Sequence, residues 1–203
     1  LEPAIVEVAR QASPVNHDVL ANPKVHLLIG DAREVVLTSR AQYDLVVSEP
    51  SNPYRAGVAS LFTQEFYAAV RARLAPGGLF AQWLQAYEVD SRTIATVYAT
   101  LGAVFPEVQT WQTLPTDLVL IAGTGPIAAD GASLRERIGV EPYRTALALA
   151  WRSSDLEGLL AHYVATPAFA RAVAARDAVP RNTDDRTPIE FGFARSAGRT
   201  NLF

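Results

Sequence analysis

Short β-rich apolar runs alternate with helical stretches along most of this chain, and this alternation constrains its fold more than any other feature. The spacing of apolar residues predicts helices over residues 3–20 (bent or ended by Pro14), 32–39, 61–74 and 91–104. The apolar runs predict strands over residues 24–29, 43–48, 79–84, 108–114 and 117–122. Pro76-Gly77-Gly78 is expected to stop the helix before it. The pattern favours an α/β fold with a doubly wound, mostly parallel sheet, in which the first two strands are buried and the last two form an antiparallel pair at one edge.

The composition changes after Gly123. Alanine, leucine and arginine dominate residues 132–178, and runs of β-branched residues are few, so we expect three or four short helices there. We therefore predict two parts: an α/β domain over residues 1–125, and a helical appendage with a C-terminal tail over residues 126–203.

The composition also excludes several kinds of partner. Eighteen basic and 21 acidic residues give a net charge of -3, which offers no general attraction to nucleic acid or anionic lipid. No apolar run approaches the roughly 18 residues of a membrane-spanning helix, so we expect no membrane contact from this segment. The chain has no cysteine, and its three histidines (His17, His26 and His162) are not at metal-ligand spacing. We therefore expect no metal site.

Polar side chains follow the predicted strands at the points where each strand ends. In open α/β sheets, ligands bind at the carboxyl ends of the strands, where loops converge and helix N-termini face the crevice. Asp31, the stretch 49–54 and the stretch 82–87 occupy these positions. They are the first candidates for a functional site.

Gly30-Asp31-Ala32 lies between a predicted strand and a predicted helix. The Asp31 carboxylate can accept a hydrogen bond from an exocyclic amine, and the small Ala32 lets a flat ring approach the backbone. The alternative is that Asp31 caps the helix. The two roles are compatible.

Glu49 stands at a strand end and is fixed by Pro50, with the Asn52 amide three residues later. A rigid carboxylate–amide pair of this kind can bind or deprotonate an amine. The alternative is a proline-rich turn in which Glu49 is merely solvated. In the next strand, Gln82 must find a hydrogen-bond partner and is a ligand candidate, whereas packing is favoured for Trp83.

Asn182-Thr183-Asp184-Asp185-Arg186 is a second polar stretch, far along the chain. It is interpreted either as an acidic, salt-bridged surface turn or as a segment that closes over the site, and the sequence leaves both open.

Together these motifs resemble the spermidine synthase-like branch of the class I S-adenosylmethionine-dependent methyltransferase fold, in particular a bacterial subgroup often fused to membrane-spanning or helical-repeat segments. The resemblance runs from Leu1 to about Ala122. It rests on the following motifs: Leu1-Glu2-Pro3, Gly30-Asp31-Ala32, Tyr43-Asp44 to Pro53, Leu61-Phe62 with Glu65-Phe66-Tyr67, and Pro76-Gly77-Gly78 with Gln82.

The resemblance implies a nucleoside-binding transferase domain over residues 1–125. It implies that Asp31 and Ala32 contact the adenine of S-adenosylmethionine or its decarboxylated form, and that Glu2 matches the second acidic position of a cofactor motif. Glu49 falls where the family has the aspartate that deprotonates the attacking amine. Asn52 falls where the family has a second, amine-binding aspartate. Gln82 falls on a glutamine of the active-site wall.

The chain departs from the family pattern at three places. Glutamate replaces aspartate at Glu49, an amide replaces a carboxylate at Asn52, and the active-site tyrosine before the last strand has no counterpart in Leu114-Pro115-Thr116. The resemblance predicts an enzyme that alkylates a small-molecule amine, by aminopropyl transfer, and the departures leave two alternatives open. These are an S-adenosylmethionine-dependent methyltransferase and a nucleoside-binding domain without transfer chemistry.

The chain begins at Leu1, contains no methionine and enters a helical pattern almost at once. This suggests a piece of a longer protein, with the first strand and its glycine-rich turn upstream. By analogy with the family we expect a homodimer in the cytoplasm, in a parent protein whose N-terminus is compatible with a membrane segment.

Overall fold

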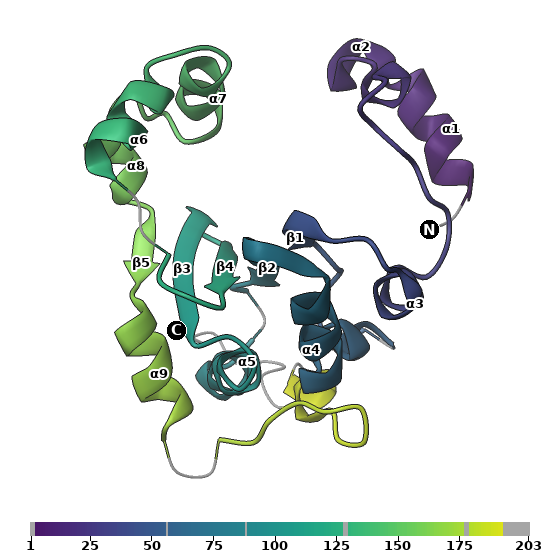
Figure 1. Cartoon of the computed structure of the whole chain (residues 1–203), viewed down its shortest axis with the longest axis vertical. Coiled ribbons are helices and arrows are strands. Elements are labelled where there is room, and N and C mark those ends of the chain that lie inside the picture. Colours follow the sequence, from purple (N-terminus) through teal and green to yellow (C-terminus); the bar gives the residue numbers. More distant parts are fainter. Residues whose placement is uncertain (1–2, 56, 88, 128–129, 177–178, 193–203) are drawn as a thin grey trace. The chain divides into compact units, whose positions relative to one another are not determined.

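The computed structural model describes residues 3–55, 57–87, 89–127, 130–176 and 179–192 (Figure 1). The chain divides into two compact units, Leu1–Ser39 and Arg40–Phe203. The expected division at residue 125 stays a prediction. Among the described residues, no helix combines the length and the apolar character needed to cross a bilayer.

The first unit contains short helices that bury none of their residues. They are α1 (Pro3–Gln11), α2 (Ser13–Asn16), a 3₁₀ turn (Val19–Ala21) and α3 (Ala32–Thr38). The helix expected over residues 3–20 is present only as separate pieces: α1 ends at Gln11, and α2 ends at Asn16, before His17 and Asp18 with positive φ. Pro14 lies in the first turn of α2, where its missing N–H costs no hydrogen bond.

The strand expected over residues 24–29 is wrong. The segment has no regular secondary structure, and its apolar side chains are exposed, Leu28 by 73% and Leu27 by 48%. A β-strand exists only when a neighbour accepts and donates its backbone hydrogen bonds. No strand among the described residues pairs with this run.

The second unit is built on a five-stranded sheet with the order β1-β2-β4-β3-β5 (Figure 1). The strands are β1 (Tyr43–Ser48), β2 (Leu74–Gln85), β3 (Glu107–Leu114), β4 (Asp117–Gly123) and β5 (Tyr163–Ala165). The α/β class is confirmed, as are β1 and the β3–β4 hairpin. Only β1 and β2 are parallel in the described sheet, and the other pairings are antiparallel.

β2 begins earlier than predicted. Helix α4 (Gln64–Arg73) ends directly at Leu74, and Pro76-Gly77-Gly78 lies inside β2 as an irregularity in its pairing with β1. Gly77 has φ +78, and a Cβ added at Gly78 would lie 2.9 Å from the carbonyl oxygens of Ala75 and Tyr43. The two glycines are therefore needed for a bulge against β1 rather than for the end of the helix.

β1 was expected to be buried, and this is also wrong. Leu45 is 54% exposed and Val47 63% exposed. β1 forms one edge of the described sheet, with β2 as its partner strand. Leu45 and Val47 pair with Leu79 and Ala81, so their side chains point to the face opposite Phe80 and Gln82, which the described helices of this unit do not cover as they do in a typical parallel sheet.

Helices α4, α5 (Ser91–Gly102) and α9 (Pro167–Ala174) cover the sheet face that carries Phe80, Gln82 and Leu84 (Figure 1). The core has an aromatic centre in which the Phe80 ring lies 5.6 Å from Tyr67 and 5.9 Å from Phe105, between ring centroids. All three rings are fully buried. This packing fixes the sheet against α4 and therefore fixes the loop between β1 and α4.

Tyr67→Phe should stabilise the protein. The Tyr67 hydroxyl is buried and has no hydrogen-bond partner among the described residues, and its burial raises the pKa of the phenol. Removing an unpaired buried hydroxyl should raise the free energy of unfolding by about 1 kcal/mol, measured by urea denaturation.

Tyr98→Phe is the matched control for Tyr67→Phe. The buried Tyr98 hydroxyl is hydrogen-bonded to Thr110 Oγ1 at 2.6 Å. Its removal should lower the free energy of unfolding by about 1 kcal/mol. Equal destabilisation by the two substitutions would contradict the assignment of Tyr67 as unpaired.

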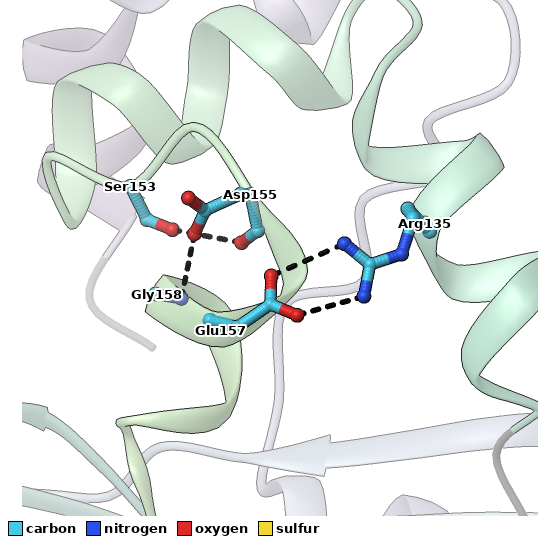
Figure 2. Close-up of polar contacts among 5 residues, drawn as sticks. All are labelled: Arg135, Ser153, Asp155, Glu157 and Gly158. Atoms are coloured by element: carbon cyan, nitrogen blue, oxygen red, sulfur yellow. Dashed lines mark hydrogen bonds and ion pairs between the residues drawn. The ribbon is translucent and has the colours of Figure 1, made fainter.

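The expectation of three or four short helices after residue 132 is confirmed by α6 (Gly131–Ile138), α7 (Tyr143–Ala150), α8 (Leu156–Leu160) and α9. The sequence analysis missed β5. Figure 2 shows how α6 and α8 are joined, with the Arg135 guanidinium donating to both carboxylate oxygens of Glu157 at 3.1 and 2.8 Å. This hydrogen bonding lowers the pKa of the Glu157 carboxyl. Asp155 caps α8 by accepting from Gly158 N at 2.8 Å.

Candidate functional site

The loop that follows β1 is held in shape by its own backbone. Arg55 N donates to Asn52 O at 3.0 Å, and Val58 N donates to Arg55 O at 3.0 Å. Pro53 is buried. The loop then enters a 3₁₀ turn (Val58–Phe62) whose Ala59 and Phe62 are in the core. Two prolines and a buried anchor therefore give Glu49 a defined backbone position.

Asn52 connects the loops that follow β1 and β2. Its Nδ2 donates to the Tyr54 hydroxyl, and the Tyr87 hydroxyl lies 3.5 Å from Asn52 Oδ1, the limit of a hydrogen bond. Because β1 and β2 are parallel, with Ser48 opposite Gln82, their carboxyl ends lie at the same edge of the sheet. The expected convergence of the two polar stretches is observed. Tyr54 and Tyr87 belong to the two candidate stretches, but the sequence analysis gave neither residue an individual role.

Glu49 opens onto a cavity of about 240 Å³ on one face of the sheet. Its lining residues come from β1 to β4 and the residue after β1: Val47, Glu49, Ala81, Trp83, Thr113, Asp117 and Val119. Two of them are carboxylates, one is an indole, and none is basic. Such a surface attracts a cation, both by charge and by the negative face of the aromatic ring.

Asp117 is the residue of this cavity that sequence reasoning missed as a site residue. It is the first residue of β4 and lies opposite Gln85 near the carboxyl end of β2. The signal was present in the hairpin: an acidic residue at the start of the last strand, which an antiparallel partner brings to the edge where β2 ends. Trp83 lines the same cavity and is half-buried, so its side chain both packs against the protein and faces the cavity.

Gln82 lies on the opposite face of the sheet from Glu49. Its side chain is fully buried, and Nε2 donates to Ser48 O at 3.4 Å and to Trp83 O at 3.0 Å. Its Oε1 has no hydrogen-bond partner among the described residues. The structure thus places Gln82 beside the end of β1 but outside the Glu49 cavity.

Asp31 caps α3. Its Oδ1 accepts hydrogen bonds from Arg33 N at 2.8 Å and Glu34 N at 3.3 Å, and the side chain is exposed. Ala32 is the first residue of the helix. The capping interpretation is confirmed, and the contact of Asp31 and Ala32 with adenine stays a prediction. Glu2 lies outside the described residues.

The stretch 182–186 docks on the core. Asn182 is fully buried: its backbone N–H donates to Thr100 Oγ1 at 2.8 Å, and its Nδ2 donates to Ala59 O at 3.1 Å. Asp184 N donates to Glu65 Oε2 at 3.0 Å. The stretch therefore supports the 3₁₀ turn behind the Glu49 loop, a role that neither interpretation of the sequence included.

The chain is similar in sequence to proteins of one known family. The family model for the spermine/spermidine synthase domain matches residues 1–123. A polyamine aminopropyltransferase of Korarchaeum cryptofilum is 29% identical over 106 residues, which are 52% of this chain and 33% of that protein. The matched part of the chain thus spans about a third of this relative's length.

Two solved structures have a similar fold. A probable spermidine synthase from Corynebacterium glutamicum superposes with a TM-score of 0.57 and 20% identity, over 88% of this chain and 61% of that chain. A spermidine synthase in complex with the transition state analogue AdoDATO gives a TM-score of 0.58 and 19% identity, over 85% of this chain and 57% of that chain. At this level of identity the likeness concerns the fold.

Proposed function

The chain belongs to the spermine/spermidine synthase family, and from this membership we propose that the protein transfers an aminopropyl group to the nitrogen of a small amine. The observation that carries the proposal is the cavity beside Glu49. It combines the carboxylates of Glu49 and Asp117 with the Trp83 indole, and none of its described lining residues is basic. An ammonium group is the ligand that such a surface favours.

Glu49 is proposed as the base. The amine nitrogen attacks the carbon next to the donor's sulfonium sulfur, the C–N bond forms as the C–S bond breaks, and the sulfur leaves in a neutral thioether. The attacking nitrogen must lose one proton, and the Glu49 carboxylate accepts it. Asn52, held by Tyr54 and near Tyr87, orients the amine. Positioning and removal of this proton supply most of the catalysis.

Decarboxylated S-adenosylmethionine is the proposed donor. Asp31 uses Oδ1 for the α3 cap, and its Oδ2 makes no hydrogen bond to a described residue. One carboxylate oxygen therefore remains available for the adenine amino group, with the small Ala32 beside it. Glu2 completes the proposed set toward the donor, whereas Gln82, which is buried on the other face of the sheet, holds the end of β1 through Ser48 O rather than lining the cavity.

The test is an assay of the natural full-length protein with 1,4-diaminobutane and each donor form in turn, with products identified by mass spectrometry. We expect an aminopropylated diamine with the decarboxylated donor only. A methylated amine formed with S-adenosylmethionine would replace the proposal by methyl transfer. Calorimetric binding of either donor with no product from any amine would replace it by a nucleoside-binding domain.

Asp117→Asn should weaken amine binding without changing the chemistry. Loss of one carboxylate from the cavity should raise KM for the diamine about fivefold, the equivalent of an ion pair worth about 1 kcal/mol. The turnover number and the affinity for the donor should stay near wild type, because Asp117 takes no proton in the proposed reaction. Steady-state kinetics at varied diamine concentration measure both quantities.

Asp44→Asn is the control for Asp117→Asn. Asp44 is an exposed carboxylate on β1 that does not line the cavity, so its removal changes the net charge equally. It should leave KM unchanged. A fall in turnover with constant KM in Asp117→Asn would contradict a binding role for Asp117.

A further inference from the structure

A second and larger cavity lies between α5 and α9, and we call it the α5–α9 groove. Its volume is about 610 Å³, within the range of small-molecule sites. Figure 1 shows α9 following β5 along the chain and lying next to α5. The apolar walls are formed by side chains of both helices and of the sheet: Ile94, Tyr98, Leu118, Val164, Phe169 and Val173.

The groove is separate from the Glu49 cavity. Thr110 and Leu118 line the groove, whereas Val119 and Thr113 line the Glu49 cavity. Since neighbouring residues of a strand point to opposite faces, the two cavities lie on opposite sides of the sheet. β5 and α9 also lie beyond residues 1–123, the part of the chain that matches the family model.

The two buried polar side chains of the groove, Tyr98 and Thr110, are paired with each other. The Tyr98 hydroxyl and Thr110 Oγ1 satisfy each other at 2.6 Å. Val164 and Phe169 are each 51% exposed where they line the groove. The walls therefore offer an apolar surface to a ligand without leaving a buried polar group to be satisfied.

The charge of the groove has one sign. Arg92 and Arg176 line it, and none of the described lining residues is acidic. Neither guanidinium forms a hydrogen bond or an ion pair with a described residue. The carboxylates on adjoining elements are engaged: Asp90 caps α5 through Thr93 N at 2.7 Å, and Glu107 pairs with Arg171 at 2.8 Å.

The position of Arg92 is not explained by the stability of its helix. It lies in the first turn of α5, where the helix dipole favours anions and disfavours a cation. An anion bound in the groove would offset the unfavourable interaction between the Arg92 guanidinium and the dipole of α5. A guanidinium binds a carboxylate through two parallel hydrogen bonds, which gives both affinity and orientation.

We propose that the α5–α9 groove binds an organic monocarboxylate with an apolar body, such as a medium-chain fatty acid. The apolar chain lies against Ile94, Phe169 and Val173, and the carboxylate meets Arg92 and Arg176. This site is independent of amine transfer, because it lies on the other face of the sheet.

The test is calorimetric titration of the full chain with decanoate, and with decan-1-ol as the uncharged analogue. We expect decanoate to bind below about 1 mM. The double variant Arg92→Gln/Arg176→Gln should weaken decanoate about tenfold while changing decan-1-ol less than about twofold, since only the carboxylate loses charge-assisted hydrogen bonds. Arg137→Gln, which removes an arginine of α6 outside the groove, should change neither.

Val164→Trp provides a second test. Val164 is half exposed and lines the groove, so an indole there should hinder both decanoate and decan-1-ol while leaving the thermal midpoint within a few degrees. Absence of decanoate binding, equal weakening of decanoate by Arg137→Gln, or full binding by Val164→Trp would each overturn the proposal. Aminopropyl transfer by these variants should match wild type, so failure of the groove proposal is distinguishable from failure of the proposed function.

Discussion

Glu49→Gln should lower the turnover number for aminopropyl transfer by about 10²- to 10⁴-fold, the usual contribution of a general base. The substitution keeps the size of the side chain and its place on the cavity wall, but an amide cannot accept the proton that the attacking amine nitrogen must lose. Affinity for the donor, measured by calorimetry, should not change. Single-turnover kinetics with saturating diamine isolate the chemical step.

Two further variants sharpen this prediction. Glu136→Gln removes an exposed carboxylate of α6 and should leave turnover unchanged. Glu49→Asp keeps the base but withdraws it by one methylene, and we expect activity between that of wild type and Glu49→Gln because misplacement of a base is costly. Wild-type turnover in Glu49→Gln would exclude Glu49 as the base, whatever the donor.

Asn182→Ala should destabilise the protein by about 2 kcal/mol, the largest effect we expect from a residue outside the cavity. The Asn182 side chain is fully buried, and its Nδ2 satisfies the Ala59 carbonyl in the 3₁₀ turn behind the Glu49 loop. Alanine would leave that carbonyl unpaired and open a small void. Urea denaturation should show a lower midpoint with an unchanged slope.

Asp185→Ala controls for a general effect of changing this turn. Asp185 is exposed in the same stretch, and its replacement should change the free energy of unfolding by less than about 0.5 kcal/mol. Hydrogen exchange should quicken around the turn Val58–Phe62 in Asn182→Ala only. Equal stability of the two variants would show that the buried contact to Ala59 contributes nothing.

The candidate site was predictable where it depends on local chain order. Glu49 and Asn52 follow a strand that the apolar run Tyr43–Ser48 indicated. The loops that follow β1 and β2 lie at the same edge of the sheet because the two strands are parallel. Gln82 and Trp83 are adjacent in a strand, and the alternation of side chains puts them on opposite faces. Asp117 required the register of the hairpin with β2, which the sequence analysis did not work out.

The sequence by itself determined the helices, because their hydrogen bonds and caps are local. Asp31, Thr63 and Asp90 each accept a backbone N–H within three residues; α3 and α5 begin at the predicted residues, whereas α4 begins at Gln64, three residues later than predicted. The hairpin β3–β4 was equally predictable, since a two-residue connection leaves few alternatives.

Tertiary structure alone decided which apolar runs became strands and what their side chains face. Residues 24–29 have the composition of a strand but no partner among the described residues, whereas the short run Tyr163–Ala165 became β5 because β3 offered its edge. Asn182 became a core residue through contacts with Ala59 and Thr100, far away in sequence. Strand pairing and burial depend on residues distant along the chain, and for that reason a local pattern does not specify them.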